Sequence, residues 1–97
     1  MEQQRKKYQE KAHETLDDIF KGIESLEEKL RYASKDFSEN MEVNIKAMKE
    51  EGEKLNVKFR EMCQSNSDSW KDVRNGFERA ISTLRESLAD TWKKMKE

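Results

Sequence analysis

The one histidine of this 97-residue chain lies in a segment whose spacing suits metal binding. Glu10 and His13 form a Glu-x-x-His pair, which places two ligands on one face of a helix, as in carboxylate-bridged di-metal bundles. Such a centre needs two of these pairs and two further glutamates, so only a dimer of this chain would assemble it. Because acids crowd this whole segment, we expect a solvated or structural histidine and predict no metal.

The single cysteine is the other residue with reactivity of its own. No histidine lies near Cys63 along the chain, and a catalytic cysteine needs a base that activates its thiol. A single cysteine also excludes an internal disulfide and fits a reducing compartment, so we expect a cytoplasmic protein. We expect Cys63 to pack beside Met62, with an intermolecular disulfide across a dimer as the alternative.

Neighbouring acids such as Glu27/Glu28 and Glu50/Glu51 are the remaining candidates for acid–base chemistry. Charged residues make up 42% of the chain, so pairs of this kind are expected without any catalytic role. Nothing near them in the sequence would set their pKa values apart, which acid–base catalysis requires. We therefore predict no catalytic residue and no cofactor, and a protein that is not an enzyme.

Aromatic and basic residues gather in the last third of the chain. Three aromatic residues of this segment, Trp70, Phe77 and Trp92, are followed by Lys93, Lys94 and Lys96. The segment could therefore lie on a membrane surface or bind an anionic partner. Lysines at the end of a helix also complement its dipole, and a net charge of -1 supplies no attractive field. We do not expect nucleic-acid or membrane binding, and keep a peripheral membrane or anionic-surface binder that uses this last helix as the second function.

Long helices must position these residues, because the chain lacks proline and has only three glycines, and these are the residues that usually interrupt helices. Apolar residues recur at steps of three or four without losing phase, which is the a/d rhythm of a coiled coil. We predict an all-α fold with one helix over residues 4–64 and, as the alternative, a break near residues 34–40. The stripe consists of Tyr8, Ala12, Leu16, Ile19, Ile23, Leu26, Leu30, Ala33, Phe37, Met41, Ile45, Met48, Gly52, Leu55, Phe59 and Met62.

Short polar residues over 64–69 predict a turn, because such side chains compete with the backbone for hydrogen bonds. A second helix is expected over residues 69–96, with Ser69 and Asp72 as a capping box. Gly52 and Gly76 are expected where helices approach closely. The stripe resumes through Val73, Phe77, Ala80, Leu84, Leu88, Thr91 and Met95.

These lengths predict self-association of a single domain over residues 1–97. At 1.5 Å per residue, the first helix would be roughly 90 Å long and the last about 40 Å. The shorter helix, folded antiparallel onto the longer one, leaves the stripe between Tyr8 and Ala33 bare, and an antiparallel homodimer would cover it. If the chain breaks near residues 34–40, three helices of about 28 residues instead close into a monomeric three-helix bundle.

Residues 67–84 carry an ordered set of residue types that resembles the C-terminal signature of a group of small bacterial coiled-coil proteins. The shared order is a tryptophan, an acid, an aliphatic residue, a basic residue and a glycine, then alanine and leucine: Trp70, Asp72, Val73, Arg74, Gly76, Ala80 and Leu84, with Glu78 between the glycine and the alanine. The basic opening over residues 5–11 is also similar. The resemblance implies a loose association with bacterial stress and no assigned catalytic residues. The chain departs from the pattern in using Met and Phe where Ala-rich helices are typical.

The sequence thus predicts a cytoplasmic, non-enzymatic coiled-coil protein with an interaction or structural role. Its partner is expected to be a second copy of the chain, or else another protein.

Overall fold

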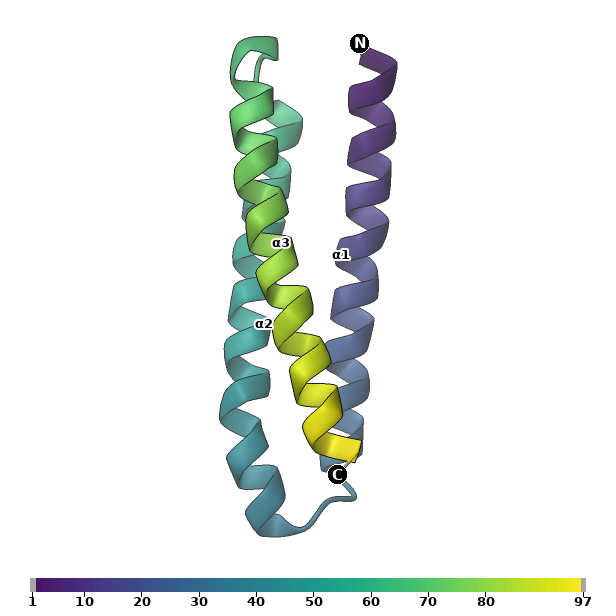
Figure 1. The fold of residues 1–97 in the computed structure, drawn as a ribbon, viewed down its shortest axis with the longest axis vertical. Helices are drawn as coiled ribbons and strands as arrows, with labels where there is room; N and C mark the ends of the chain where they lie inside the picture. The colour runs from purple at the N-terminus through teal and green to yellow at the C-terminus, as the bar shows by residue number, and fades with distance from the viewer. Residues whose placement is uncertain (1, 97) are drawn as a thin grey trace.

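The computed structural model describes residues 2–96, and these form three helices joined by two short turns (Figure 1). Helix α1 spans Glu2–Leu30, α2 spans Lys35–Gln64 and α3 spans Ser67–Lys96. The helices α1 and α3 run in one direction and α2 in the other, which produces a rod of 51 × 18 × 16 Å (Figure 1). Helix α1 begins and α3 ends at opposite ends of this rod. The prediction of an all-helical chain is confirmed for the described residues.

The prediction of one helix over residues 4–64 is wrong, because the chain reverses at residues 31–34. The three backbone N–H groups that follow α1 donate to carbonyls three residues earlier, which is the tightened geometry of a helix end. Ser34 then has an extended backbone, and its hydroxyl accepts a hydrogen bond from the Phe37 N–H at 3.4 Å. Ser34 is therefore the N-cap of α2, and three helices, the predicted alternative, are what the structure shows.

The second turn consists of two residues that cap the helices on either side of it. The backbone N–H and the hydroxyl of Ser65 both donate to the Met62 carbonyl, at 3.3 and 2.7 Å. The Asn66 Oδ1 accepts hydrogen bonds from the Ser69 N–H at 2.9 Å and from the Ser69 hydroxyl at 2.8 Å. Asn66, and not Ser69, is therefore the N-cap of α3, and the predicted capping box with Asp72 is not formed.

Replacing Asn66 with alanine is expected to lower the free energy of unfolding by about 1 kcal/mol, because the first turn of α3 loses its cap. Urea denaturation followed by circular dichroism measures this change. Ser67→Ala is the matched control, since Ser67 is an exposed neighbour whose side chain makes no hydrogen bond within residues 2–96. An equal loss in the two variants would contradict the assignment of Asn66 as the cap.

All three helices contribute to one continuous apolar core. Its buried members, all but Ile81 on the predicted stripe, are Ala12, Leu16, Ile19, Ile23, Leu26, Met41, Ile45, Met48, Leu55, Met62, Phe77, Ile81 and Leu84. The α1 part of the stripe is thus covered by α2 and α3 of the same chain. The bare seam from which we predicted a homodimer is not present in this fold, so self-association needs another surface.

Two glycines allow side chains of one helix to pack directly on the backbone of another. A Cβ atom at Gly52 would lie 3.0 Å from the Phe20 ring, and one at Gly22 would lie 2.8 Å from a methyl group of Leu88. Phe20 therefore fixes α1 on α2, and Leu88 fixes α3 on α1. The expected close approach is found at Gly52, while Gly76 has no heavy atom within 4 Å of the equivalent position.

Candidate functional site

His13 is not part of a group of three potential metal ligands within the described residues of one chain. No three His, Cys, Asp or Glu residues gather in residues 2–96 in a way that could hold a metal ion. The His13 ring packs on Phe59, with 5.6 Å between the ring centroids, and its Nδ1 lies 3.6 Å from the Asp17 carboxylate. Both side chains of this contact are more than half exposed, and Glu10 is not part of it.

Cys63 lies on the surface near the end of α2. Partial burial raises the pKa of its thiol, while the positive charge of Arg5 acts in the opposite direction. A raised pKa lowers the thiolate fraction at neutral pH, and the thiolate is the reactive form. The environment of Cys63 therefore does not activate it as a nucleophile.

A cluster of aromatic and cationic side chains joins the start of α1 to the start of α3. The rings of Tyr8 and Trp70 meet edge to face, with 5.7 Å between their centroids. The guanidinium of Arg74 lies 5.7 Å from the Tyr8 ring centroid and 5.2 Å from that of Trp70, and the guanidinium of Arg5 lies 5.5 Å from the Trp70 ring. These are cation–π distances, so the charges stabilise the ring packing.

Arg5 also closes the end of α2. Its Nη2 donates to three backbone carbonyls, those of Met62 at 3.1 Å, Cys63 at 3.2 Å and Ser65 at 2.6 Å. The last carbonyls of a helix have no acceptor role within the helix and carry its negative dipole end, so a cation stabilises them. Arg5 of α1 thus binds carbonyl groups of residues that follow it by 57 to 60 positions in the sequence.

Tyr8 is held as a neutral side chain in this cluster. Burial raises the pKa of its hydroxyl, and the neighbouring Glu78 carboxylate raises it further, while Arg74 opposes them. The phenol therefore stays protonated at any physiological pH. Tyr8, Trp70, Arg5 and Arg74 thus each contact another member of the cluster.

The two tryptophans predicted to favour a surface-binding role are both packed against the core. Trp70 belongs to the cluster at one end of the rod, and Trp92 lies under the Lys29 ammonium at the other, with 4.3 Å between Nζ and the ring centroid. Within residues 2–96, no helix has the combination of length and apolar character that crossing a bilayer requires.

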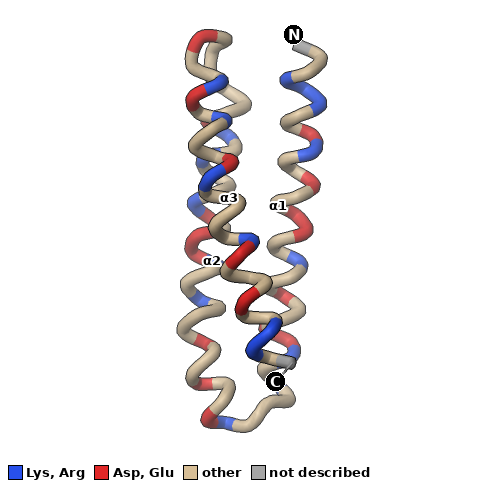
Figure 2. The backbone as a smooth tube through the Cα atoms, in the orientation of Figure 1, with Lys and Arg blue, Asp and Glu red and all other residues tan. Residues whose placement is uncertain are grey.

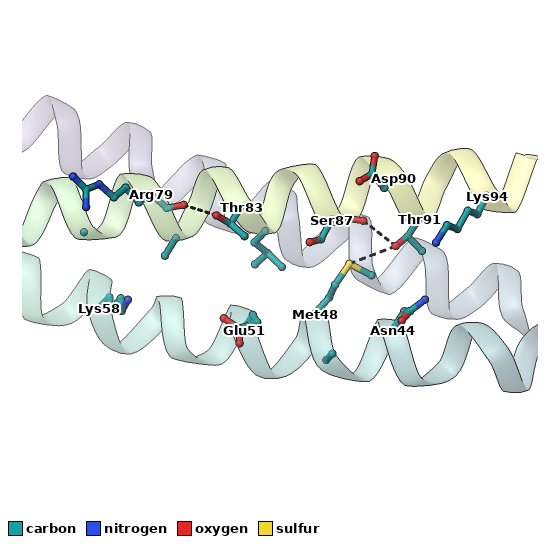
Figure 3. Close-up of a pocket in the computed structure, with 14 residues that line it drawn as sticks. Asn44, Met48, Glu51, Lys58, Arg79, Thr83, Ser87, Asp90, Thr91 and Lys94 are labelled. Carbon is teal, nitrogen blue, oxygen red and sulfur yellow. Dashed lines mark hydrogen bonds between the residues drawn. The ribbon is translucent and has the colours of Figure 1, made fainter.

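An open groove runs between α2 and α3 on the side of the rod away from α1 (Figure 3). It has a volume of about 710 Å³, and no residue of α1 lines it. Buried Met48, Leu84 and Thr91 lie among its lining residues, and the Thr91 hydroxyl donates to the Ser87 carbonyl at 2.8 Å. Five of its eleven other lining residues are small: Ala47, Gly76, Ala80, Thr83 and Ser87.

Charges flank this groove in a defined order. Lys58 of α2 and Arg79 of α3 lie at the same end of the groove, and Glu51 and Asp90 lie further along (Figure 3). Glu51 pairs with Lys54 on its own helix at 3.5 Å, whereas Lys58, Arg79 and Asp90 form no ion pair within residues 2–96. Acidic and basic residues are intermixed along all three helices (Figure 2).

Gly76→Ala is expected to raise the free energy of unfolding by about 1 kcal/mol, because alanine has the higher helix propensity and the new methyl group enters open space. Gly52→Ala is the matched control, since its methyl group would meet the rigid Phe20 ring at 3.0 Å and the gain would be lost. Chemical denaturation in dilute solution compares the two. Equal stabilisation by both substitutions would contradict the packing of Phe20 on Gly52.

No family model matches the chain, and neither do the curated proteins or the solved structures compared with it. The resemblance to small bacterial coiled-coil proteins therefore stays a prediction from the sequence. In the structure, the residues that carry it serve two faces of α3. Trp70 and Arg74 belong to the cluster with Tyr8, whereas Gly76 and Ala80 line the groove.

Proposed function

We propose that the protein is a non-enzymatic helical interaction protein whose partner packs a helix into the groove between α2 and α3. The observation that carries this proposal is the open groove itself, whose lining includes five small residues from α2 and α3. Small side chains allow a second helix to approach closely, and insertion of an amphipathic helix into a groove is a common mode of recognition.

The dimensions of the groove support a helical partner. Its lining residues on α3 extend from Gly76 to Lys94, which corresponds to about 27 Å of helix, or five turns. The two residues with distinctive reactivity, His13 and Cys63, do not line it. Location in the cytoplasm and a role in bacterial stress, both inferred from the sequence, belong to the same proposal.

The second function, binding of α3 to an anionic surface, receives less support. Trp70 and Trp92 would have to supply the apolar contact with such a surface, and both pack against the core. The exposed Lys93 and Lys94 are the groups that remain for it.

Photo-crosslinking in the native cell tests the interaction proposal. A photo-reactive amino acid is placed at Thr83 in the groove and, as the control, at exposed Glu14 on α1. We expect a reproducible crosslink to one protein from position 83 alone, and its loss when Gly76→Trp fills the groove. Circular dichroism verifies that Gly76→Trp still folds. No crosslink from position 83, or the same products from both positions, would contradict the proposal.

A further inference from the structure

We propose that the helix that fills this groove is α3 of a second copy of the chain, running in the opposite direction, so that the protein forms a two-fold symmetric dimer. This inference rests on the proposed function, since it names the partner of the same groove. It does not depend on the bare seam expected from the sequence, which the fold covers. Two independent patterns in the groove support it, one of side-chain size and one of charge.

Six of the nine groove-lining residues of α3 form three pairs that are symmetric about the midpoint between Thr83 and Leu84. A two-fold axis at this point sets Gly76 opposite the partner's Thr91, Ala80 opposite the partner's Ser87, and Thr83 opposite the partner's Leu84. All six residues line the groove, and each pair contains at least one small side chain. A surface that contacts its own copy across a two-fold axis needs this kind of self-complementarity.

The charges on α3 match the same arrangement. Arg79 and Asp90 both line the groove and are 11 residues apart, which is about 16 Å and three turns, so they lie on the same side of the helix. Reversal of α3 about the Thr83–Leu84 midpoint places the partner's Asp90 within one turn of Arg79. The symmetry forms this pair twice, and both groups have no ion-pair partner within residues 2–96 of a single chain.

The charges on α2 extend the match. Met48 lies level with Thr91, and Phe59 lies level with Phe77, so positions on α2 can be related to positions on α3. This relation places Lys58 about level with Arg79, as Figure 3 shows.

The partner's Asp90 therefore enters the end of the groove that carries two cations, Lys58 and Arg79. The partner's Arg79 reaches the level of Glu51. Lys94 extends one turn further and lies beyond the cationic pair. Opposite charges thus meet at both ends of the contact, and such complementarity selects the register of an interface.

Sedimentation equilibrium from micromolar to millimolar concentration tests the proposal, with a reducing agent present so that a Cys63 disulfide does not contribute. We expect a species of twice the chain mass of 11.6 kDa. Arg79→Asp and Asp90→Arg should each weaken the dimer at least about tenfold, because like charges then face each other. The double variant Arg79→Asp/Asp90→Arg should restore the affinity, since residue 79 of one copy faces residue 90 of the other.

The matched control is the double variant Lys21→Asp/Glu24→Arg on the exposed side of α1, which should leave the affinity unchanged. Thermal unfolding verifies that each variant folds. A monomer at every concentration, or a dimer that neither single substitution weakens, would overturn the proposal. If the purified chain is monomeric while position 83 crosslinks to a different protein, the second-copy inference fails and the interaction function stands.

Discussion

Replacement of Phe77 with alanine is expected to lower the free energy of unfolding by about 3–5 kcal/mol. Phe77 is 1% exposed and its ring lies 5.9 Å from that of Phe59, so truncation leaves a cavity between α2 and α3. Domains of this size are stable by about 5–15 kcal/mol, so the variant should lose much of its margin. Urea denaturation followed by circular dichroism measures the loss.

Tyr32→Ala is the control for this experiment, because Tyr32 is also aromatic but is 86% exposed in the turn after α1. Its free energy of unfolding should stay within about 0.5 kcal/mol of the wild type. A loss below about 1 kcal/mol for Phe77→Ala would be too small for a buried aromatic residue and would contradict its central place in the core.

Replacement of Arg5 with alanine is expected to cost about 2 kcal/mol, a large effect for a residue so near the start of the chain. The variant loses three hydrogen bonds to the end of α2 and the contact with the Trp70 ring. Hydrogen exchange should also show faster exchange of the Ser65 amide, since the turn between α2 and α3 is no longer held by α1.

Arg5→Lys and Lys6→Ala separate the possible causes of this effect. Lysine keeps the positive charge but lacks the planar guanidinium, so it should restore only part of the stability. Lys6 is an exposed neighbour of the same charge, and its truncation should have little effect. Full restoration by lysine would show that charge alone stabilises the end of α2, contrary to the hydrogen-bonded geometry.

The positions of the core residues could be predicted from the sequence, because burial on one side of a helix imposes a spacing of three or four residues. Leu16, Ile23, Leu55 and Phe77 were all placed on the stripe and are all buried. Ile81 was missed because the stripe was followed through Ala80, its neighbour on the groove side. Periodicity identifies a face but does not resolve the edge of that face.

The chain reversal between α1 and α2 was misjudged because its sequence has no glycine or proline and the stripe keeps its phase across it. The turn instead uses Ser34 as an N-cap. The apolar spacing of three and four residues continues from Leu30 through Ala33 to Phe37, so this spacing does not reveal the turn. The wrong helix length then produced the wrong reason for a dimer.

The sequence contains no pattern that predicts the cluster of Arg5, Tyr8, Trp70 and Arg74. From the sequence, Arg74 and the segment with Arg5 enter only the family resemblance, because their shared contact with Trp70 depends on how two helices align in space. The groove was missed for a related reason. Gly76 was expected at a close helix contact, yet it faces open space, which only the arrangement of α2 beside α3 reveals.

The odd number of helices has a mechanical consequence. Helix α1 begins at one end of the 51 Å rod and α3 finishes at the other, so tension applied between these two points acts parallel to the helix axes (Figure 1). Such a load shears the helices past one another and strains every layer of the core at once, whereas pulling on the two ends of a helical hairpin unzips it layer by layer. The bundle therefore has a geometry in which the whole core resists tension along the helix axes as a single unit.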